Sequence, residues 1–232
     1  MDGTGSAPQL VIFDCDGVLV DSEMLSAGVL MAMMTEDGFP LSEEAFRSDF
    51  LGRSFAAAAL RAKERFGRPL PEDFESRYRD RLFVTLEAEL KPMAGVAEVL
   101  AELRSPFCLA TSSSPRRLSL SLRASGLAQF FEGRCFTASE VQRGKPAPDL
   151  FLHAAAKMGI APAACLVIED SELGVRAGLA AGMEVWHFAG GCHVRAGYRL
   201  PPDLTPQRAL PGMRELAAAF RELGLSSSAL SP

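Results

Sequence analysis

The chain of 232 residues is 48% hydrophobic and 23% charged, with a formal net charge of -5 and an isoelectric point near 5.3. This composition is ordinary for a folded globular protein and excludes a largely disordered chain. The acidic balance argues against nucleic acid or an anionic membrane surface as a partner. The length suffices for one α/β domain with a smaller insert or second domain.

Five cysteines, odd in number, scattered and without a Cys-x-x-Cys pair, favour reduced thiols in a cytoplasmic protein. The three histidines lack metal-ligand spacing, so a histidine metal site is not expected. No apolar run is long enough to span a bilayer, and the first eight residues lack the pattern of a secretion signal. We therefore expect a cytoplasmic protein without a membrane segment.

The first strand is expected at Leu10–Phe13, an apolar run without polar alternation, as in strands buried on both faces of a parallel sheet. Asp14 then lies at the carboxyl end of this strand, where open α/β sheets bind their ligands. In an extended segment Asp14 and Asp16 share a side, while Cys15 points away. Gly17 follows, which suits a loop that approaches a ligand closely. Taken alone, these residues also fit a solvated acidic turn.

Residues 21–92 carry helical patterns and no convincing strand. Asp21 or Ser22 is a plausible N-cap for a first helix that ends near Gly38. Three more helices are expected between glycine and proline breaks, at Ser42–Leu51, Phe55–Phe66 and Pro71–Leu90. A helical block inserted after the first strand of an α/β pattern predicts an α-helical cap domain at 21–92, beside a core of 1–20 and 93–232.

Strands and helices alternate again after Pro92, which predicts an α/β fold with a doubly wound parallel sheet and right-handed connections. The expected helices are Gly95–Leu103, Pro115–Ser125, Asp149–Met158 and Leu173–Ala181. The expected strands are Phe107–Ala110, Cys135–Thr137, Cys165–Ile168 and Met183–Phe188.

Polar residues follow three further strand ends or loops of this pattern. Thr111 and three serines come after the second strand; such a loop can hold phosphate oxygens, although taken alone it more often caps the next helix. Lys145 lies in a loop that two prolines stiffen, and a loop lysine taken alone is usually solvated. Glu169 and Asp170 end another buried strand.

If the two acidic strand ends are neighbours in the sheet, four carboxylates converge: Asp14, Asp16, Glu169 and Asp170. Each like-charged pair at roughly 4 Å would cost about 4 kcal/mol at an effective dielectric constant of about 20. Lys145 offsets one charge, and the remaining excess predicts a hard divalent cation, with Mg²⁺ as the natural candidate. A metal, a lysine, hydroxyl donors and a carboxylate nucleophile are the groups that phosphoryl transfer needs.

Four motifs occur in order: Asp14-x-Asp16-Gly17-Val18, Thr111 after its strand, Lys145 in Gly-Lys-Pro-x-Pro-Asp, and Glu169-Asp170-Ser171 followed by a glycine-containing helix. They resemble the four motifs of the haloacid dehalogenase superfamily. The opening Phe-Asp-x-Asp-Gly-Val-x-x-Asp-Ser-Glu is similar to its phosphatase and β-phosphoglucomutase-like branch. This resemblance covers nearly the whole core and implies a Rossmann-like fold with a helical cap inserted after the first strand.

The resemblance implies a Mg²⁺-dependent phosphomonoester hydrolase that forms an aspartyl phosphate, with Asp14 as nucleophile and Asp16 as general acid and base. It implies that the transferred phosphoryl group is bound by Thr111, Lys145 and the amide of Ser112. It also implies four magnesium ligands: Asp14, the backbone carbonyl of Asp16, Asp170, and Glu169 either directly or through water.

Three other functions differ from a phosphatase at particular residues or motifs. A dehalogenase shares the nucleophile but needs no metal and lacks the second aspartate, so Asp16 speaks against it. A β-phosphoglucomutase-like sugar phosphomutase resembles the chain at every core motif, but it carries a histidine and an arginine approximately where this chain has Ser26 and Phe55. Hydrolysis is therefore predicted, with the mutase as the alternative. A non-catalytic binding or regulatory protein on the same fold has no support, because every motif residue is present.

Substrate choice is expected to lie in the cap, which would close over the site and exclude water. Arg53 follows a glycine suited to a loop that faces the site and is a candidate substrate contact. Arg77, Arg79 and Arg81 lie on one expected helix and cannot all face the site. We expect a small phosphorylated sugar, sugar acid or polyol as substrate, and a monomer by default.

Overall fold

The computed structural model describes residues 7–50, 55–195 and 199–226. Six parallel strands form one sheet in the order β3-β2-β1-β4-β5-β6. The strands are β1 Leu10–Phe13, β2 Phe107–Thr111, β3 Cys135–Thr137, β4 Cys165–Glu169, β5 Glu184–Phe188 and β6 Arg208–Leu210. The chain adds β2 and β3 on one side of β1 and the later strands on the other, so the order reverses at β1. Open α/β sheets bind ligands at such a switch point.

The first strand is buried on both faces, which explains its unbroken apolar sequence. Leu10 and Ile12 pack with side chains of α7 (Asp149–Met158) and α8 (Glu172–Ala180). Val11 and Phe13 face the opposite way and pack in a second apolar cluster. The core helices that contribute to this cluster are α5 Val96–Glu102, α6 Pro115–Ala124 and α10 Met213–Glu222.

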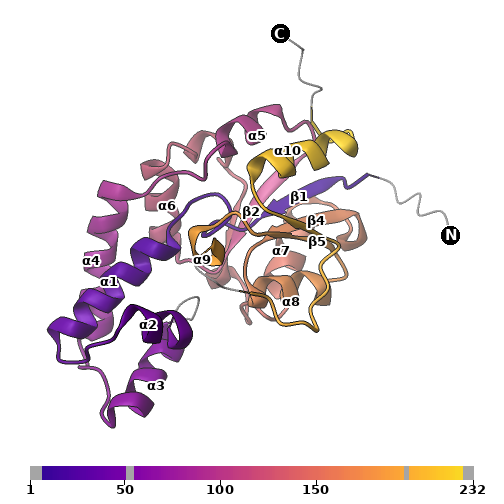
Figure 1. The fold of residues 1–232 in the computed structure, drawn as a ribbon. Helices are drawn as coiled ribbons and strands as arrows, with labels where there is room; N and C mark the ends of the chain where they lie inside the picture. Colours follow the sequence, from indigo (N-terminus) through magenta and orange to yellow (C-terminus); the bar gives the residue numbers. More distant parts are fainter. Residues whose placement is uncertain (1–6, 51–54, 196–198, 227–232) are drawn as a thin grey trace.

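Four helices separate β1 from α5 in the sequence: α1 Glu23–Glu36, α2 Glu43–Asp49, α3 Phe55–Phe66 and α4 Phe74–Glu89. Figure 1 shows them grouped on one side of the molecule, away from α7 and α8. Aromatic rings hold the block together, since Phe39 packs edge to face with Phe66 and Phe55 stacks on Phe74 and Tyr78. Helix α1 packs on α4, and α4 also packs on α6, so the block lies against the sheet domain through α6.

The predicted α/β class and parallel sheet are confirmed. The sequence reading missed β6, α10 and the short helix α9 (Cys192–Arg195). Strand β6 is a three-residue edge strand with an exposed alanine, so it has no apolar run to detect. Three 3-10 turns complete the described elements, at Ala128–Phe130, Ala138–Glu140 and Pro162–Ala164. Within residues 7–50, 55–195 and 199–226, no helix has the length and apolar character to cross a membrane.

Candidate active site

The carboxyl ends of β1, β2 and β4 lie side by side. Asp14 comes directly after β1, Thr111 is the last residue of β2, and Glu169 ends β4 with Asp170 next along the chain. The backbone amide of Asp14 donates to the carbonyl of Ile168 at 3.0 Å, which extends the β1–β4 pairing to the acidic residues. Parallel pairing in this register therefore brings residues from three distant parts of the sequence to one edge of the sheet.

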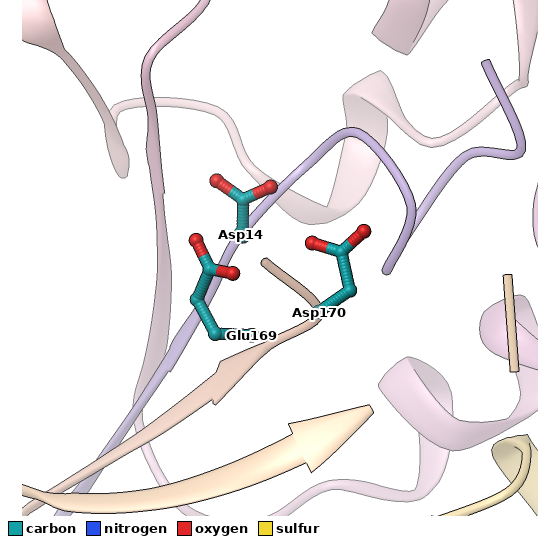
Figure 2. Close-up of side chains that lie close together, drawn as sticks. All are labelled: Asp14, Glu169 and Asp170. Carbon is teal, nitrogen blue, oxygen red and sulfur yellow. The ribbon is translucent and has the colours of Figure 1, made fainter. Parts of the chain in front are cut away.

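Three carboxylates gather at this edge. One oxygen from each of Asp14, Glu169 and Asp170 lies within 4.8 Å of the others, and all three residues are buried. Figure 2 shows the three side chains rising from the neighbouring strand ends. Burial is the main cause that raises the pKa of Asp14 and of Asp170 well above the ordinary range. Burial and mutual repulsion destabilise the ionised form of these carboxylates. A divalent cation would offset both effects, and carboxylate oxygens are the hard ligands that such a cation prefers.

Lys145 provides a positive charge for this cluster. Its Nζ atom lies 2.6 Å from Asp14 Oδ1, 2.7 Å from Glu169 Oε1 and 3.2 Å from the Ala110 carbonyl. Burial would lower the pKa of Lys145, but the two carboxylates outweigh it and raise the pKa, so the lysine stays charged. A loop lysine taken alone is usually solvated, but the side chain of Lys145 is 3% exposed and contacts the acidic cluster, as the sequence predicts.

Glu169 is fixed by its neighbours in the chain. Its Oε2 accepts hydrogen bonds from the Ser171 amide at 2.7 Å and the Ser171 hydroxyl at 3.0 Å. Burial raises the pKa of Glu169, but Lys145 and these hydrogen bonds lower it overall. Gly174 leaves room for the carboxylate, because a Cβ atom there would lie 1.7 Å from Glu169 Oε1. Gly17 does the same for Asp170: a Cβ would lie 1.8 Å from Oδ2, and its φ of +81° also favours glycine.

The carboxylate of Asp16 lies outside the cluster of three, so the predicted convergence of four acids is wrong for this residue. The chain does not continue as a strand after Asp14. The amides of Leu19 and Val20 both donate to the Cys15 carbonyl, and Gly17 takes a positive φ, so the alternation of a strand no longer applies. Instead, the Asp16 carboxylate accepts hydrogen bonds from the side chains of Ser22, Ser113 and Arg117.

These donors determine the charge of Asp16. Burial raises its pKa, but the Arg117 guanidinium and the Ser113 and Ser22 hydroxyls outweigh burial and lower the pKa. Ser22 occupies the N-cap position of α1, as expected, yet its hydroxyl bonds Asp16 rather than the helix. The sequence did not predict this contact, because a serine at the start of a helix is usually expected to cap that helix.

Two further residues at the site escaped the sequence reading. Arg117 lies in the first turn of α6, after the polar loop that follows β2. His193, in α9, is buried and has its Nε2 atom 3.1 Å from Asp170 Oδ2. The position of Arg117 near Thr111 offered a weak signal, whereas nothing in the spacing of His193 pointed to the site.

The remaining predicted residues take different places. Thr111 is buried, and its hydroxyl accepts a hydrogen bond from the Ser113 amide at 3.0 Å. Ser112 is exposed beside it, whereas Ser114 caps α6 by accepting from the Arg117 amide at 3.3 Å. Arg53 lies outside the described residues. The three arginines of α4 pair with acids of the helical block, namely Arg77 with Asp37 and Asp73, Arg79 with Glu75, and Arg81 with Glu36.

Comparison with known proteins shows the family to which this chain belongs. The model of the haloacid dehalogenase-like hydrolase family matches residues 8–182, and the chain belongs to this family. It is 28% identical over 186 residues to the 6-phosphogluconate phosphatase of Escherichia coli, covering 80% of this chain and 84% of the relative. It is 30% identical over 184 residues to the phosphorylated carbohydrates phosphatase of Thermotoga maritima, covering 76% and 82%.

A solved structure extends the comparison to nearly the whole chain. The haloacid dehalogenase family hydrolase of Deinococcus radiodurans, with bound phosphate and sodium, is 33% identical. The two folds superpose with a TM-score of 0.79, over 97% of this chain and 100% of that one. The family and the fold thus agree with those expected from the sequence.

Proposed function

We propose that this protein is a Mg²⁺-dependent phosphomonoester hydrolase that acts through an aspartyl phosphate on Asp14. The observation that carries the proposal is the position of Asp14. It is buried at the switch point of the sheet, bonded to Lys145 and adjacent to two more carboxylates. A carboxylate so placed can attack phosphorus while charged neighbours stabilise the transferred group.

The reaction has two steps. An oxygen of Asp14 forms a bond to phosphorus as the ester P–O bond breaks, and Asp16 donates a proton to the departing oxygen. Asp16 then takes a proton from a water molecule, whose oxygen forms a bond to phosphorus as the P–O bond to Asp14 breaks, which releases phosphate and restores the Asp14 carboxylate. The lowered pKa of Asp16 favours its ionised carboxylate, the form that accepts the proton in this second step.

Different residues of the site would bind the metal and the phosphoryl group. The carboxylates of Asp14, Glu169 and Asp170, with the Asp16 backbone carbonyl, would hold Mg²⁺, which supplies positive charge to the phosphoryl oxygens when bound. Lys145, Thr111 and the Ser112 amide would bind the phosphoryl oxygens. The phosphate bound to the Deinococcus relative supports a phosphate site in this fold.

We further propose that residues 21–92 form the cap domain and that residues 1–20 and 93–232 form the core. The substrate would be a small phosphorylated sugar, sugar acid or polyol, a class supported by relatives named as phosphatases of 6-phosphogluconate and phosphorylated carbohydrates. Arg53 stays a candidate substrate contact. The scattered cysteines support a cytoplasmic enzyme, and the acidic composition argues against nucleic acid or membrane partners. A monomer is the default.

The test is a panel of phosphomonoesters assayed for phosphate release with and without Mg²⁺, using the wild-type chain and Asp14→Asn. We expect metal-dependent release that Asp14→Asn abolishes. Activity that survives this substitution would show that another group is the nucleophile.

The mutase alternative has less support. Phe55, near the place where mutases carry an arginine, stacks on Phe74 and Tyr78 within the helical block and offers no cation. The two reactions are separated by incubating the protein with glucose 1-phosphates and a bisphosphate activator. Isomerisation that outruns phosphate release would overturn the hydrolase proposal.

A further inference from the structure

We infer that Arg117 is a positioning residue of the reaction, which holds the Asp16 carboxylate in place and joins it to helix α1. The inference rests on the proposed function, in which Asp16 carries the proton. It concerns a residue outside the four motifs, in the helix after β2.

The contacts of Arg117 come from two other parts of the chain, the loop after β1 and the start of helix α1. Its Nη2 atom lies 2.9 Å from Asp16 Oδ1, in the loop after β1. The same nitrogen lies 3.5 Å from the Ser22 hydroxyl, at the start of α1, and 3.4 Å from the Ser26 hydroxyl, in its first turn. The guanidinium therefore touches the proposed proton carrier and the first cap helix together.

The environment of Arg117 differs from that of the other arginines with described ion pairs. Arg61, Arg79 and Arg81, for example, pair on the exposed surface of the helical block, where an ion pair contributes little. The side chains of Arg117 and Asp16 are only 22% and 15% exposed. Removing one partner of a poorly hydrated pair leaves the other charge without compensation.

The Nε atom of Arg117 is buried and has no hydrogen-bond partner among the described residues. A buried donor that lacks a partner carries a cost. The hydrogen bonds of the guanidinium are therefore made by Nη2, which contacts Asp16 and the start of α1, whereas Nε makes none among the described residues. This is the arrangement expected of a group that orients a carboxylate.

Asp16 has only three side-chain donors in the described structure, and Arg117 is the charged one. Without Arg117, the carboxylate keeps the two serine hydroxyls but loses its ionic partner and its link to Ser26. We expect Asp16 then to sample other orientations, so both proton transfers slow while substrate binding changes little. A displacement of a catalytic group by about 1 Å can lower the rate by about 100-fold.

The experiment compares Arg117→Met with Arg116→Met, a matched control in the same helical turn. Arg116 is exposed and stacks over the Phe83 ring, with 4.6 Å from its guanidinium carbon to the ring centroid. With an alkyl phosphate, we expect Arg117→Met to lower kcat by about 10-fold to 1,000-fold, with KM changed by less than about twofold. Arg116→Met should leave both constants near wild type.

A double-mutant cycle with Asp16→Asn separates positioning from a structural role. If Arg117 acts through Asp16, Arg117→Met lowers the residual turnover of Asp16→Asn by less than about twofold. An equal loss in both backgrounds, or a rise in KM with kcat unchanged, would overturn the inference and assign Arg117 to substrate binding. Neither result would touch the hydrolase proposal, which depends on Asp14.

A second readout uses the leaving group. The first turnover of p-nitrophenyl phosphate needs little protonation of the departing oxygen, so Arg117→Met should slow it less than it slows the alkyl phosphate. Arg117→Lys, which keeps the positive charge, should recover part of the rate on the alkyl phosphate. It replaces Arg117→Met in the comparison if thermal melting shows that Arg117→Met folds poorly. Equal losses on both substrates in a folded variant would contradict the inference.

Discussion

The side-chain nitrogen of Lys145 lies 2.6 Å from Oδ1 of Asp14, and the two side chains are 3% and 9% exposed. The residue proposed as nucleophile is thus paired with a cation that comes from a loop 131 positions away in the sequence. The same nitrogen also lies 2.7 Å from Glu169 Oε1, so one lysine contacts two carboxylates. Because water hardly reaches this pair, each charge depends on the other.

Replacing Lys145 with Met should therefore affect both catalysis and folding. We expect kcat to fall by about 100-fold or more, as when one preorganised donor to a transition state is lost. The metal-free protein should also lose about 3 to 5 kcal/mol of unfolding free energy, the usual cost of breaking a buried pair, less whatever Asp14 recovers by taking up a proton. Urea unfolding and phosphate release measure the two effects, with exposed Lys157→Met as the control. Wild-type turnover in Lys145→Met would rule out its assigned role.

Gly174→Ala should disturb the metal cluster through Glu169. The added Cβ would meet Oε1 at 1.7 Å, so the carboxylate must move or α8 must shift. We expect a loss of about 1 to 3 kcal/mol in stability, as for other overpacked sites, and weaker Mg²⁺ binding by calorimetry. Gly28→Ala is the matched control, since no atom lies within 4 Å of its added Cβ in α1. That variant should gain stability, and a similar gain for Gly174→Ala would contradict the packing described here.

The contribution of Asp14 and Asp170 to the stability of the metal-free protein should fall as pH rises. Asp14 and Asp170 have pKa values raised by burial, so above their unfolded pKa of about 3.9 the folded chain binds more protons than the unfolded chain. Their contribution is therefore lost progressively as pH rises from about 4 through the raised pKa values. The lowered pKa of Glu169 acts oppositely, and its contribution is lost only as pH falls below about 4.3.

Mg²⁺ should reverse this trend, because its carboxylate ligands must be ionised and binding releases protons. We expect the increase in melting temperature on adding Mg²⁺ to grow with pH between about 5 and 8. Thermal melts with and without the metal measure the difference. A metal effect that is the same at every pH would contradict the raised pKa values of Asp14 and Asp170.

Ser114→Ala tests whether Ser114, in the polar loop after β2, stabilises helix α6 without taking part in substrate binding. Ser114 caps α6, and losing an N-cap serine costs about 1 kcal/mol of stability. Its substitution should lower the midpoint of urea unfolding and leave kcat/KM nearly unchanged, whereas Thr111→Val should reduce phosphate release. A large loss of activity in Ser114→Ala at unchanged stability would assign this hydroxyl to the substrate instead.

Much of the fold is readable from the sequence because burial leaves a simple pattern. The first strand is apolar at every position since both its faces are covered, and the same holds for β4 up to Glu169. Asp14, Glu169 and Asp170 could be placed together because parallel strands end at one edge of the sheet. Edge strand β6, which is partly exposed, left no comparable signal.

The rest of the site depends on packing that no local pattern encodes. The direction of Asp16 follows from a turn at Gly17, which breaks the strand alternation that a linear reading assumes. Arg117 reaches Asp16 across 101 positions, because β2, which precedes α6, pairs with β1, which precedes Asp16. His193 reaches Asp170 only through the placement of α9. These contacts are long-range and involve residue types that are usually exposed, so no local pattern predicts them.

The most direct test of the central claim is to look for phosphate on Asp14 itself. Asp16→Asn lacks the base for the second step, so the phosphorylated carboxyl group should accumulate during turnover of p-nitrophenyl phosphate with Mg²⁺. After acid quenching, mass spectrometry should find one phosphoryl group on the peptide that contains Asp14, removable by hydroxylamine and absent when Asp14 is also changed to Asn. A phosphoryl group on any other residue, or phosphate release that survives Asp14→Asn, would contradict the account.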